Sequence, residues 1–566
     1  MELLHADAFE RLVPGRRLVF TYPVVVACEK AENNSRRRVS VVVMDSAVDR
    51  RDSQVECAAM LVPCHKERDW IYASEGGQWQ LLASAAASRR RARIGDGEEE
   101  EDFVQFCDCE NCDDDDDDEG LKKQLGPLVV ALAPRICFQA GPPVIPFVSY
   151  ADNILQRIVV EGAYSTLTGA IVVEDLCDEE DRDRKSVRVV WRRRLRFKRM
   201  PNLIQTEVSL NFQSGTQTSA SEAQSNVKDL SSVDRIIHGG TQRLGVCGQT
   251  NGGLHLDHSQ LVHKYLAPIV AGLVLVAPAL EAWMELGKRV KVLALGIGGG
   301  ALPIFLHKHF GFHVQAVELD EVVLDLACRH FGLIEDALMT VEVGDGTATI
   351  DRIAMQVART GTVAVPLLEA WQQACDNSAH HLSSLSDLNS DSTHKDEKSV
   401  AEHRVLVDSN TLNVGCKNCH RAHSGKSSML CESCDARVHV IIVDVDEGDA
   451  RLGLSSPPSS FLQCRFLMGT KIALHRGGIL AMNVVPFGET LYQGVIATLM
   501  GVFEEVYETV VEDDVNRVVF ALPSAVACVP LDGPLVSLIK QLVDAQLLTR
   551  IHKVGVSNTE SMDLVV

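Results

Sequence analysis

The stretch Val290–Phe310, VKVLALGIGGGALPIFLHKHF, constrains the fold more than any other part of the chain. A short apolar run stops at Gly296, three further glycines follow within four positions, and an apolar pattern with helical spacing begins at Ala301. Glycine adopts left-handed backbone conformations and lets other groups approach the main chain closely. The stretch therefore predicts a buried strand, a tight turn and a helix, with bare backbone and free helix N–H groups available to a ligand.

Acidic residues stand at the ends of the next two predicted strands. Glu318 closes the strand in HVQAVELD, 22 positions after Gly296, and a carboxylate at that point can accept both ribose hydroxyls of an adenosine. Asp345 closes the strand in LMTVEVGDG, beside Gly346. A carboxylate there can accept a hydrogen bond from an adenine amino group. The glycine turn and the two acids together predict a nucleoside-binding edge.

A fourth predicted strand, in RVHVIIVDVDEGD, places Asp444 and Asp446 at the same edge, because the carboxyl ends of parallel strands lie together. A nicotinamide dinucleotide would also suit the glycine turn and Glu318. Asp320, directly before the next helix, and the GDG that closes the third strand favour instead the series found in class I S-adenosylmethionine-dependent methyltransferases. A helix N-cap or loop carboxylate is the alternative for each acid, and for Asp320 above all.

Longer segments extend this pattern. In the C-terminal half they are VLALGIGGGALPIFLHKHFGFHVQAVELDEVVLDLACRHFG, VIIVDVDEGDARLGLSSPPSSFL and HRGGILAMNVV, and upstream they are DWIYASEGGQWQLLASAAASRR, LTGAIVVEDL and MPNLIQTEVSL. Through these segments the chain resembles the spermidine-synthase-like branch, and within it the family of elongation factor 1-alpha lysine and N-terminal methyltransferases. The resemblance implies an α/β fold: a Rossmann-like, seven-stranded class I methyltransferase domain preceded by a β-rich α+β domain.

The resemblance also implies a role for each residue of the edge. The glycines would shape the site of S-adenosyl-L-methionine, Glu318 would hold its ribose, Asp345 with Gly346 would flank its adenine, and two acids would face the methyl donor and the incoming amine. The implied cofactor-binding residues are Gly296, Gly298, Gly300, Glu318, Asp345 and Gly346, and the implied catalytic residues are Asp444 and Asp446. The implied reaction is methylation of a protein amine, namely the N-terminal α-amine of elongation factor 1-alpha.

Other functions stay open beside this one. Members of the family usually carry a further methyltransferase domain that modifies a lysine, and we expect this chain to begin too late to contain it. Spermidine synthases transfer an aminopropyl group and typically show an acid inside the turn, G-G-G-D-G, where this chain has Ala301. A non-catalytic methyltransferase-fold scaffold is the second alternative, and the intact glycines and acids argue against it.

Composition divides the chain into three parts. We expect a β-rich N-terminal domain at 1–212, a flexible linker rich in Ser, Gly, Gln and Thr at 213–253, and the methyltransferase domain at 254–566. An acidic insert near 92–122 contains the aspartate run Asp113–Asp118, which we expect to form a solvated loop. A second insert, 357–437, is rich in Ser, Asp and His and interrupts the methyltransferase domain.

Four cysteines of the second insert form a paired C-x2-C set, namely Cys416, Cys419, Cys431 and Cys434. Thiolate tetrads at such spacings bind zinc tetrahedrally and stabilise polar loops. The spacing predicts a structural zinc site without a catalytic part, and unpaired thiols in a disordered insertion are the alternative. A weaker cluster beside the aspartate run, Cys107, Cys109 and Cys112, lacks a fourth ligand.

The net charge of −22 over 566 residues argues against a general binder of nucleic acid or anionic membranes, since both need positive surface. Acidic residues interrupt any apolar signal sequence at the N-terminus. The most apolar run, Tyr265–Trp283, is too short between its prolines and charges to span a bilayer, so a buried helix of a cytoplasmic protein is expected. The histidines before that run are expected at the surface or as helix caps, namely His255, His258 and His263.

Overall fold

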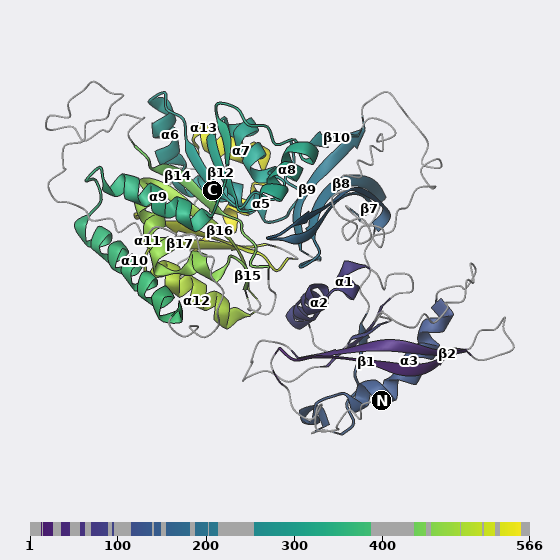
Figure 1. Cartoon of the computed structure of the whole chain (residues 1–566). Coiled ribbons are helices and arrows are strands. Elements are labelled where there is room, and N and C mark those ends of the chain that lie inside the picture. The colour runs from purple at the N-terminus through teal and green to yellow at the C-terminus, as the bar shows by residue number, and fades with distance from the viewer. Residues whose placement is uncertain are drawn as a thin grey trace, which may run out of the picture.

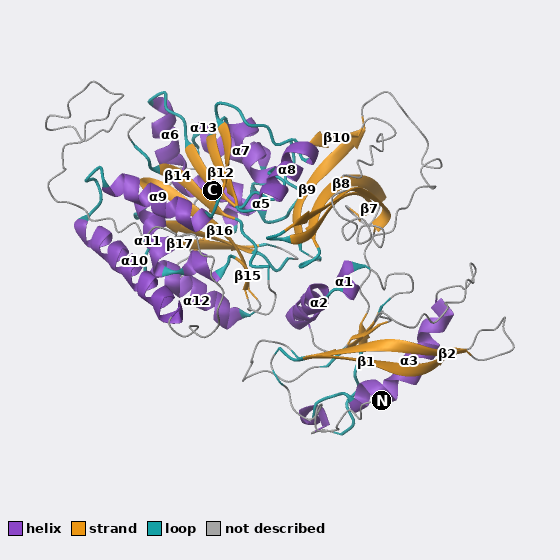
Figure 2. Cartoon of the chain, viewed as in Figure 1, coloured by secondary structure: helices purple, strands orange, loops and turns teal. Residues whose placement is uncertain are grey.

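Three β-sheets, two of five strands and one of nine, organise the part of the chain that the computed structural model describes (Figures 1 and 2). We call the first two sheet A and sheet B, in chain order, and the third the C-terminal sheet. The described residues are 13, 15–26, 35–45, 57–62, 69–88, 93–95, 115–138, 141–148, 154–181, 187–201, 203–212, 254–386, 435–448, 454–486, 488–511, 514–526 and 532–555. The predicted linker, 213–253, lies outside them.

The C-terminal sheet has the strand order expected of a class I methyltransferase. Across the sheet, its strands are β13 (Met339–Val343), β12 (His313–Glu318), β11 (Lys291–Leu295), β14 (Val438–Val443), β16 (Leu474–Pro486), β18 (Arg517–Leu522), β17 (Glu505–Val510) and β19 (His552–Lys553), with β15 (Leu454–Ser456) beside β16. The first five are parallel, and β18 is antiparallel to both of its neighbours. The order by position in the chain is 3-2-1-4-5-7-6, which confirms the predicted Rossmann-like fold.

Helices cover both faces of this sheet. One core cluster joins the sheet to α5 (Leu266–Ala271), η4 (Gly272–Val276), α6 (Ala277–Glu285), α7 (Ala301–Phe310), α13 (Pro534–Leu542) and α14 (Gln546–Thr549). The other joins it to α9 (Gly346–Ala358), α10 (Val365–Ser386), η6 (Ser459–Leu462), α11 (Cys464–Ala473) and α12 (Glu489–Met500). The central strands β11 and β14 are buried on both faces and are apolar except for Lys291 and His439 near their amino ends.

The apolar run before β11 is part of the core. Leu266–Glu285 is a helical segment of 20 residues that is long and apolar enough to cross a membrane by length and composition, contrary to the prediction that the run is too short. However, 67% of its most apolar window is buried inside the protein. Its side chains pack against β16, β18 and α13, which is the buried position expected from the sequence.

Sheet B is an antiparallel meander that packs on the methyltransferase domain. Its strands are β6 (Ile154–Ser165), β7 (Gly169–Asp181), β8 (Val187–Phe197), β9 (Ile204–Phe212) and β10 (Leu254–Asp257). One face lies against α8 (Glu321–His330) through a shared apolar cluster. β10 pairs with β9, so the first strand of the region assigned to the methyltransferase domain completes sheet B.

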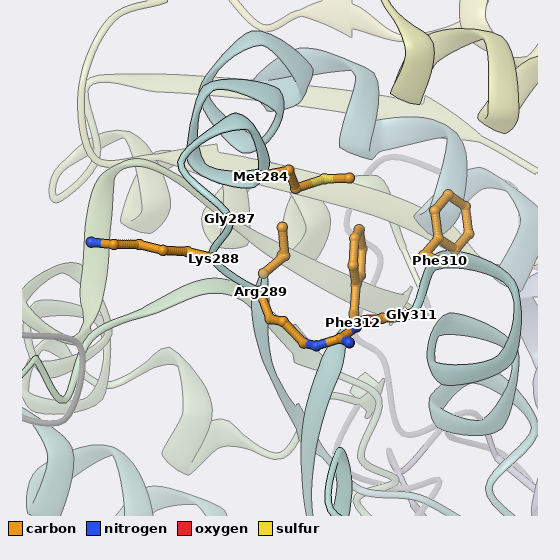
Figure 3. A pocket seen from close by; sticks show the side chains of 8 residues that line it. Met284, Gly287, Lys288, Arg289, Phe310, Gly311 and Phe312 are labelled. Atoms are coloured by element: carbon orange, nitrogen blue, oxygen red, sulfur yellow. Dashed lines mark hydrogen bonds between the residues drawn. The ribbon is translucent and has the colours of Figure 1, made fainter.

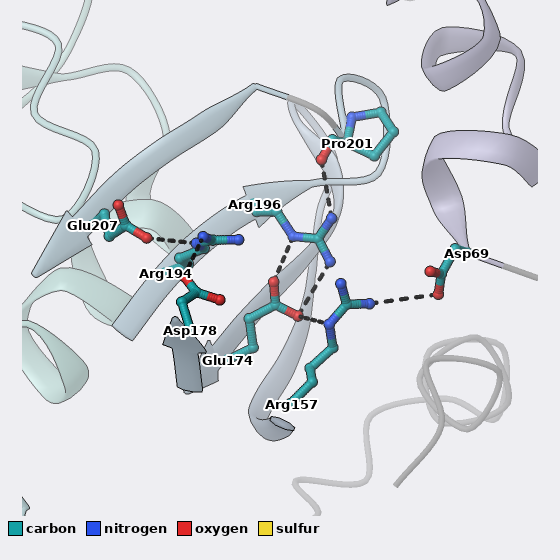
Figure 4. A network of polar contacts seen from close by, with 8 residues as sticks. All are labelled: Asp69, Arg157, Glu174, Asp178, Arg194, Arg196, Pro201 and Glu207. Carbon is teal, nitrogen blue, oxygen red and sulfur yellow. Dashed lines mark hydrogen bonds and ion pairs between the residues drawn. The ribbon is translucent and has the colours of Figure 1, made fainter. Parts of the chain in front are cut away.

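The other face of sheet B carries a network of ion pairs (Figure 4). Glu174 is fully buried, and its carboxylate lies 2.6 Å from Arg196 Nε and 3.6 Å from Arg157 Nε. Arg157 also donates to Asp69, 3.5 Å away, just before α1 (Trp70–Ala73). A buried carboxylate needs such partners to remain charged, and this chain of contacts ties sheet B to the segment that precedes it.

Sheet A forms the start of the described chain. Its strands are β1 (Arg17–Val26), β2 (Ser35–Met44), β4 (Arg93–Gly95), β3 (Ala59–Leu61) and β5 (Phe147–Val148), and its helices besides α1 are α2 (Glu75–Ser88), α3 (Asp115–Ala131) and the turn η2 (Arg135–Phe138). The loop expected for the aspartate run is wrong for Asp115–Asp118, because α3 begins at Asp115. Negative charge at a helix N-terminus interacts favourably with the helix dipole, which allows a run of aspartates to begin a helix.

The second insert also begins with a helix. α10 occupies Val365–Ser386, within the segment predicted as a polar insertion, and residues 387–434 lie outside the described part. Trp371 is buried, and Leu368 and Cys375 pack on the same core. These three residues lie three and four positions apart, which is the spacing of one helix face. The surrounding Ser and His residues hide this short apolar pattern in the sequence.

The packing of η4 against β18 predicts that a larger side chain at Gly272 would destabilise the fold. A Cβ at Gly272 would lie 2.0 Å from Cε1 of the buried Phe520 ring, so Gly272→Ala should lower the free energy of unfolding by about 1–3 kcal/mol. In α12 a Cβ at Gly494 meets nothing within 4 Å, so Gly494→Ala should raise it by roughly 0.5–1 kcal/mol. Denaturant unfolding of both variants tests the packing, and equal stabilities would contradict it.

Candidate functional site

The glycine turn is built by contacts that exclude side chains. Gly296, Gly298 and Gly300 have φ of +80°, +52° and +84°, a region that L side chains rarely adopt. A Cβ at Gly296 would lie 2.2 Å from the carbonyl oxygen of Asp444, at the end of β14. The turn therefore brings the carboxyl ends of β11 and β14 together as the sequence predicts, and α7 begins at Ala301 directly after it.

Strand β9 of sheet B lies directly against this turn. Gly299 N donates to Thr206 Oγ1 at 2.5 Å, and a Cβ at Gly298 would lie 2.8 Å from the carbonyl oxygen of Gln205. Sheet B is thus a wall of the site. Reasoning from the sequence missed both residues, although they lie in MPNLIQTEVSL, one of the segments that carried the family resemblance.

Glu318 faces the turn from the end of β12. Its Oε2 accepts from Ile297 N at 3.2 Å and its Oε1 accepts from Asp320 N at 3.1 Å. Burial raises the pKa of Glu318, and these two backbone donors oppose the rise. Beside it, Leu319 is 58% exposed, although its side chain is large and apolar. The bond from Ile297, which lies between two glycines of the turn, thus places the carboxylate predicted to hold a ribose next to the glycines.

Two further acids of the edge are helix N-caps. Asp320 accepts from Val322 N at 2.9 Å and begins α8. Asp345 begins α9 and uses one oxygen, Oδ1, to accept from the backbone N and the hydroxyl of Thr347 at 2.7 and 2.8 Å. The capping alternative therefore holds for both Asp320 and Asp345. Asp345 is exposed and keeps Oδ2 outside these capping bonds, with Gly346 next to it.

Asp444 is held by hydrogen bonds to both of its oxygens. Tyr265 Oη donates to Oδ2 and Asn483 Nδ2 donates to Oδ1, each at 3.0 Å. Asn483 in turn accepts from Asn516 Nδ2 at 2.8 Å. Burial raises the pKa of Asp444, and the bonds from Asn483 and Tyr265 oppose the rise. Asp444 is therefore fixed in position.

Asp446 differs from Asp444 although it lies only two positions further on. Its side chain is 9% exposed, and neither of its oxygens has a hydrogen bond of good geometry within the described residues. Arg199 Nη2, from the turn after β8, is 3.5 Å from Oδ2. Burial raises the pKa of Asp446 to about 6, against the opposing charge of Arg199. Asp446 is thus a carboxylate that can still meet a cationic or proton-donating ligand.

One histidine belongs to the site, contrary to the surface or capping position expected for it. The His263 ring lies edge-on to Tyr265 with 5.5 Å between ring centroids, and its Nε2 is buried without a hydrogen bond in the described part of the chain. Burial lowers the pKa of His263, which favours the neutral ring. The sequence held no signal for this position, because it depends on contacts with Tyr265 and β9.

The predicted zinc site stays a prediction. Its ligands, Cys416, Cys419, Cys431 and Cys434, lie outside the described residues, as do Cys107, Cys109 and Cys112. Within the described ranges there is no group of three or more His, Cys, Asp or Glu side chains placed to hold a metal ion.

Two hollows lie at the opposite edge of the C-terminal sheet. One, of about 270 Å³, is lined at the amino ends of β11 and β12 by residues that include Lys288, Arg289 and Phe312 (Figure 3). The other, of about 210 Å³, includes His313 and Val438. Both therefore lie away from the glycine turn and the acids.

Comparison with known proteins finds relatives of this chain among curated proteins. No protein-family model matches it. The curated proteins that match over 85% of its length include those of Bos taurus and Homo sapiens, 25% and 24% identical and named eEF1A lysine and N-terminal methyltransferase. They also include one of Drosophila pseudoobscura pseudoobscura, 22% identical and named as a homolog of it. The chain is a homologue of these methyltransferases. It spans about half of their length, 51–53%.

Solved structures were compared as well. Human methyltransferase-like protein 13 in complex with SAH is 23% identical, with a TM-score of 0.32, over 50% of this chain and 92% of that one. A probable spermidine synthase from Corynebacterium glutamicum is 12% identical, with a TM-score of 0.32, over 68% of this chain and 86% of that one. At these scores the fold assignment rests on the strand order.

The bond between the turn and sheet B predicts a stability effect. Thr206→Val keeps the shape of the side chain but leaves Gly299 N–H without its acceptor, so it should lower the free energy of unfolding by about 1–3 kcal/mol. The matched control is Thr470→Val in α11, where the buried hydroxyl has no partner in the described structure and its removal should be neutral or stabilising. Equal effects of the two variants in denaturant unfolding would contradict the assigned bond.

Proposed function

We propose that the chain is an S-adenosylmethionine-dependent methyltransferase that modifies an amine of a protein, with the N-terminal α-amine of eEF1A as its substrate. The observation that carries the proposal is the shared edge on which Glu318 faces the bare glycine turn while Asp446 lies buried without a hydrogen-bonded partner among the described residues. The names of the relatives support both the reaction and the substrate.

The residues at this edge suit S-adenosylmethionine. Gly296 and Gly300 supply the left-handed backbone of the tight turn, and Glu318 presents a carboxylate beside it, suited to ribose hydroxyls. Gln205 Nε2, on the wall formed by β9, is buried, and this side-chain amide faces the Asp446 carboxylate at the same edge. When bound, the cofactor supplies a methyl group carried on a sulfonium.

The two acids after β14 divide the remaining work. Asp444 has both oxygens engaged and shapes the edge, whereas Asp446 can accept a hydrogen bond from the incoming amine and, through water, its proton. An α-amine, with an ordinary pKa near 7.7–8.0, costs about 1 kcal/mol to deprotonate at neutral pH, whereas a lysine near 10.4 costs roughly 4–5 kcal/mol. A carboxylate with little basic strength is therefore sufficient for an α-amine.

A first test concerns the cofactor. Glu318→Gln should weaken S-adenosylmethionine binding about ten- to a hundredfold, because it removes the charge that strengthens hydrogen bonds to the ribose, worth roughly 1.5–3 kcal/mol. Glu321→Gln removes the same charge from an exposed position three residues further on and should leave the affinity within about twofold. Isothermal calorimetry on both folded variants measures the difference, and equal affinities would remove Glu318 from the site.

A second test concerns the reaction. Incubation of the full chain with isotope-labelled S-adenosylmethionine and purified eEF1A should place label on the first residue of the factor, located by mass spectrometry of its peptides. Asp446→Asn should abolish transfer while retaining cofactor binding, because it keeps the shape and loses the carboxylate. Label on a lysine would contradict the proposed substrate amine, and an aminopropyl product from putrescine and the decarboxylated cofactor would favour the spermidine-synthase reaction.

A further inference from the structure

Arg199 stands where three parts of the chain meet. It lies in the turn between β8 and β9, and its guanidinium packs over the Phe197 ring at 5.2 Å from the centroid. A Cβ at Gly448, in the loop after β14, would lie 2.3 Å from Arg199 Nη1, and Gly448 has a φ of +77°. The loop that carries Asp446 therefore has bare backbone where the guanidinium rests on it.

Helix α2, which lies in the region of sheet A, holds the backbone of the β8–β9 turn in place. A Cβ at Gly76 in α2 would lie 1.8 Å from the carbonyl oxygen of Arg199, so helix α2 packs directly on the turn. Ser74 Oγ lies within 3.4 Å of the Lys198 carbonyl, and Lys198 Nζ lies 5.8 Å from the centroid of Trp70. On the other side, the Pro201 carbonyl accepts from Arg196 of the buried ion-pair network (Figure 4).

Charged and polar groups face Asp446 from three elements. Arg199 comes from the β8–β9 turn, Gln205 from β9, and Glu447 with the Gly448 amide from the loop of Asp446 itself. Arg199 is the one cation in this set. Its ion pair with Asp446, 3.5 Å long, opposes both the burial of the carboxylate and the negative charge of Glu447.

We propose that Arg199 is a positioning residue for methyl transfer, which holds Asp446 ionised and aimed into the site, and that the β-rich region therefore contributes to the reaction itself. This inference rests on the proposed function. Arg199 acts through Asp446 and not on the reacting atoms. Its removal should impair the chemical step and leave the cofactor contacts at Glu318 intact.

The test compares Arg199→Gln, Arg199→Lys and the control Lys198→Gln in the full chain. Lys198→Gln removes the same charge from the same turn, one residue away, at a side chain directed to Trp70. The measurements are kcat and KM for methyl transfer to eEF1A from pH 5 to 9, and the Kd of S-adenosylmethionine by calorimetry. Circular dichroism establishes that each variant is folded.

The expected result follows from the sign of the pKa shift. The active form of Asp446 is the carboxylate, so wild-type activity falls as the pH drops through about 6. Without Arg199 the largest of the groups that offset the burial is lost, so the acid limb should move to higher pH by roughly one unit, with kcat at low pH reduced about tenfold. Arg199→Lys should restore most of the position of the limb, and all three variants should bind S-adenosylmethionine within about twofold of wild type.

Three outcomes would overturn the inference. A folded Arg199→Gln with an unchanged pH profile and kcat would show that the ion pair has no role, and a more active Arg199→Gln would show that the guanidinium blocks the place of the substrate amine. An equal loss of kcat in Lys198→Gln would show that the effect comes from the overall charge of the turn and not from the ion pair with Asp446. If Arg199→Gln does not fold, Arg199→Met keeps the aliphatic stem beside Phe197 and removes the charge; an acid limb of this variant that coincides with that of wild type decides against the inference. Failure of the proposed function is distinct, because wild type itself would then transfer no methyl group.

Discussion

The contact of bare backbone with bare backbone at the glycine turn is the constraint on which the rest of the site depends. Gly296 lies against the carbonyl of Asp444, and Gly298 against the carbonyl of Gln205, at separations that leave no room for a Cβ. These contacts bring the ends of β11 and β14 together and press sheet B onto the same edge. Any side chain at either glycine would separate elements that jointly form this edge of the site.

The acids at this edge look alike in the sequence but have different properties in the fold, because each has different hydrogen-bond or charge partners. Asp444 has both oxygens hydrogen-bonded, Asp320 serves a helix end, and Glu318 is braced by two backbone amides. Asp446 is buried with an arginine as its nearest countercharge. The partners of Asp444 and Asp446 come from β16, from Tyr265 directly before α5 and from the β8–β9 turn of sheet B, so the division of roles is a property of the tertiary structure.

The sequence was sufficient for the parts of the site that depend on local pattern. The glycine turn and the strand ends at Glu318 and Asp345 follow from short-range periodicity and from the geometry of parallel strands, whereas the Rossmann-like order of the strands was implied by the family resemblance. The wall formed by Thr206, the position of His263 and the ion pair of Arg199 could not be predicted, because each joins segments that lie far apart in the chain. The helix start at Asp115 was missed for a different reason, since composition alone does not separate a solvated loop from an acidic helix end.

The buried ion pairs of sheet B have a consequence for how this region can change over time. Glu174 is enclosed with Arg196 and Arg157, and loss of one partner would leave an uncompensated charge in the interior, at a cost of about 3–5 kcal/mol. Replacement of the whole set by apolar residues of similar volume would cost little. Related sequences should therefore keep all three residues or exchange them together. A lineage that replaces the charged set by apolar residues one at a time must pass through unstable intermediates.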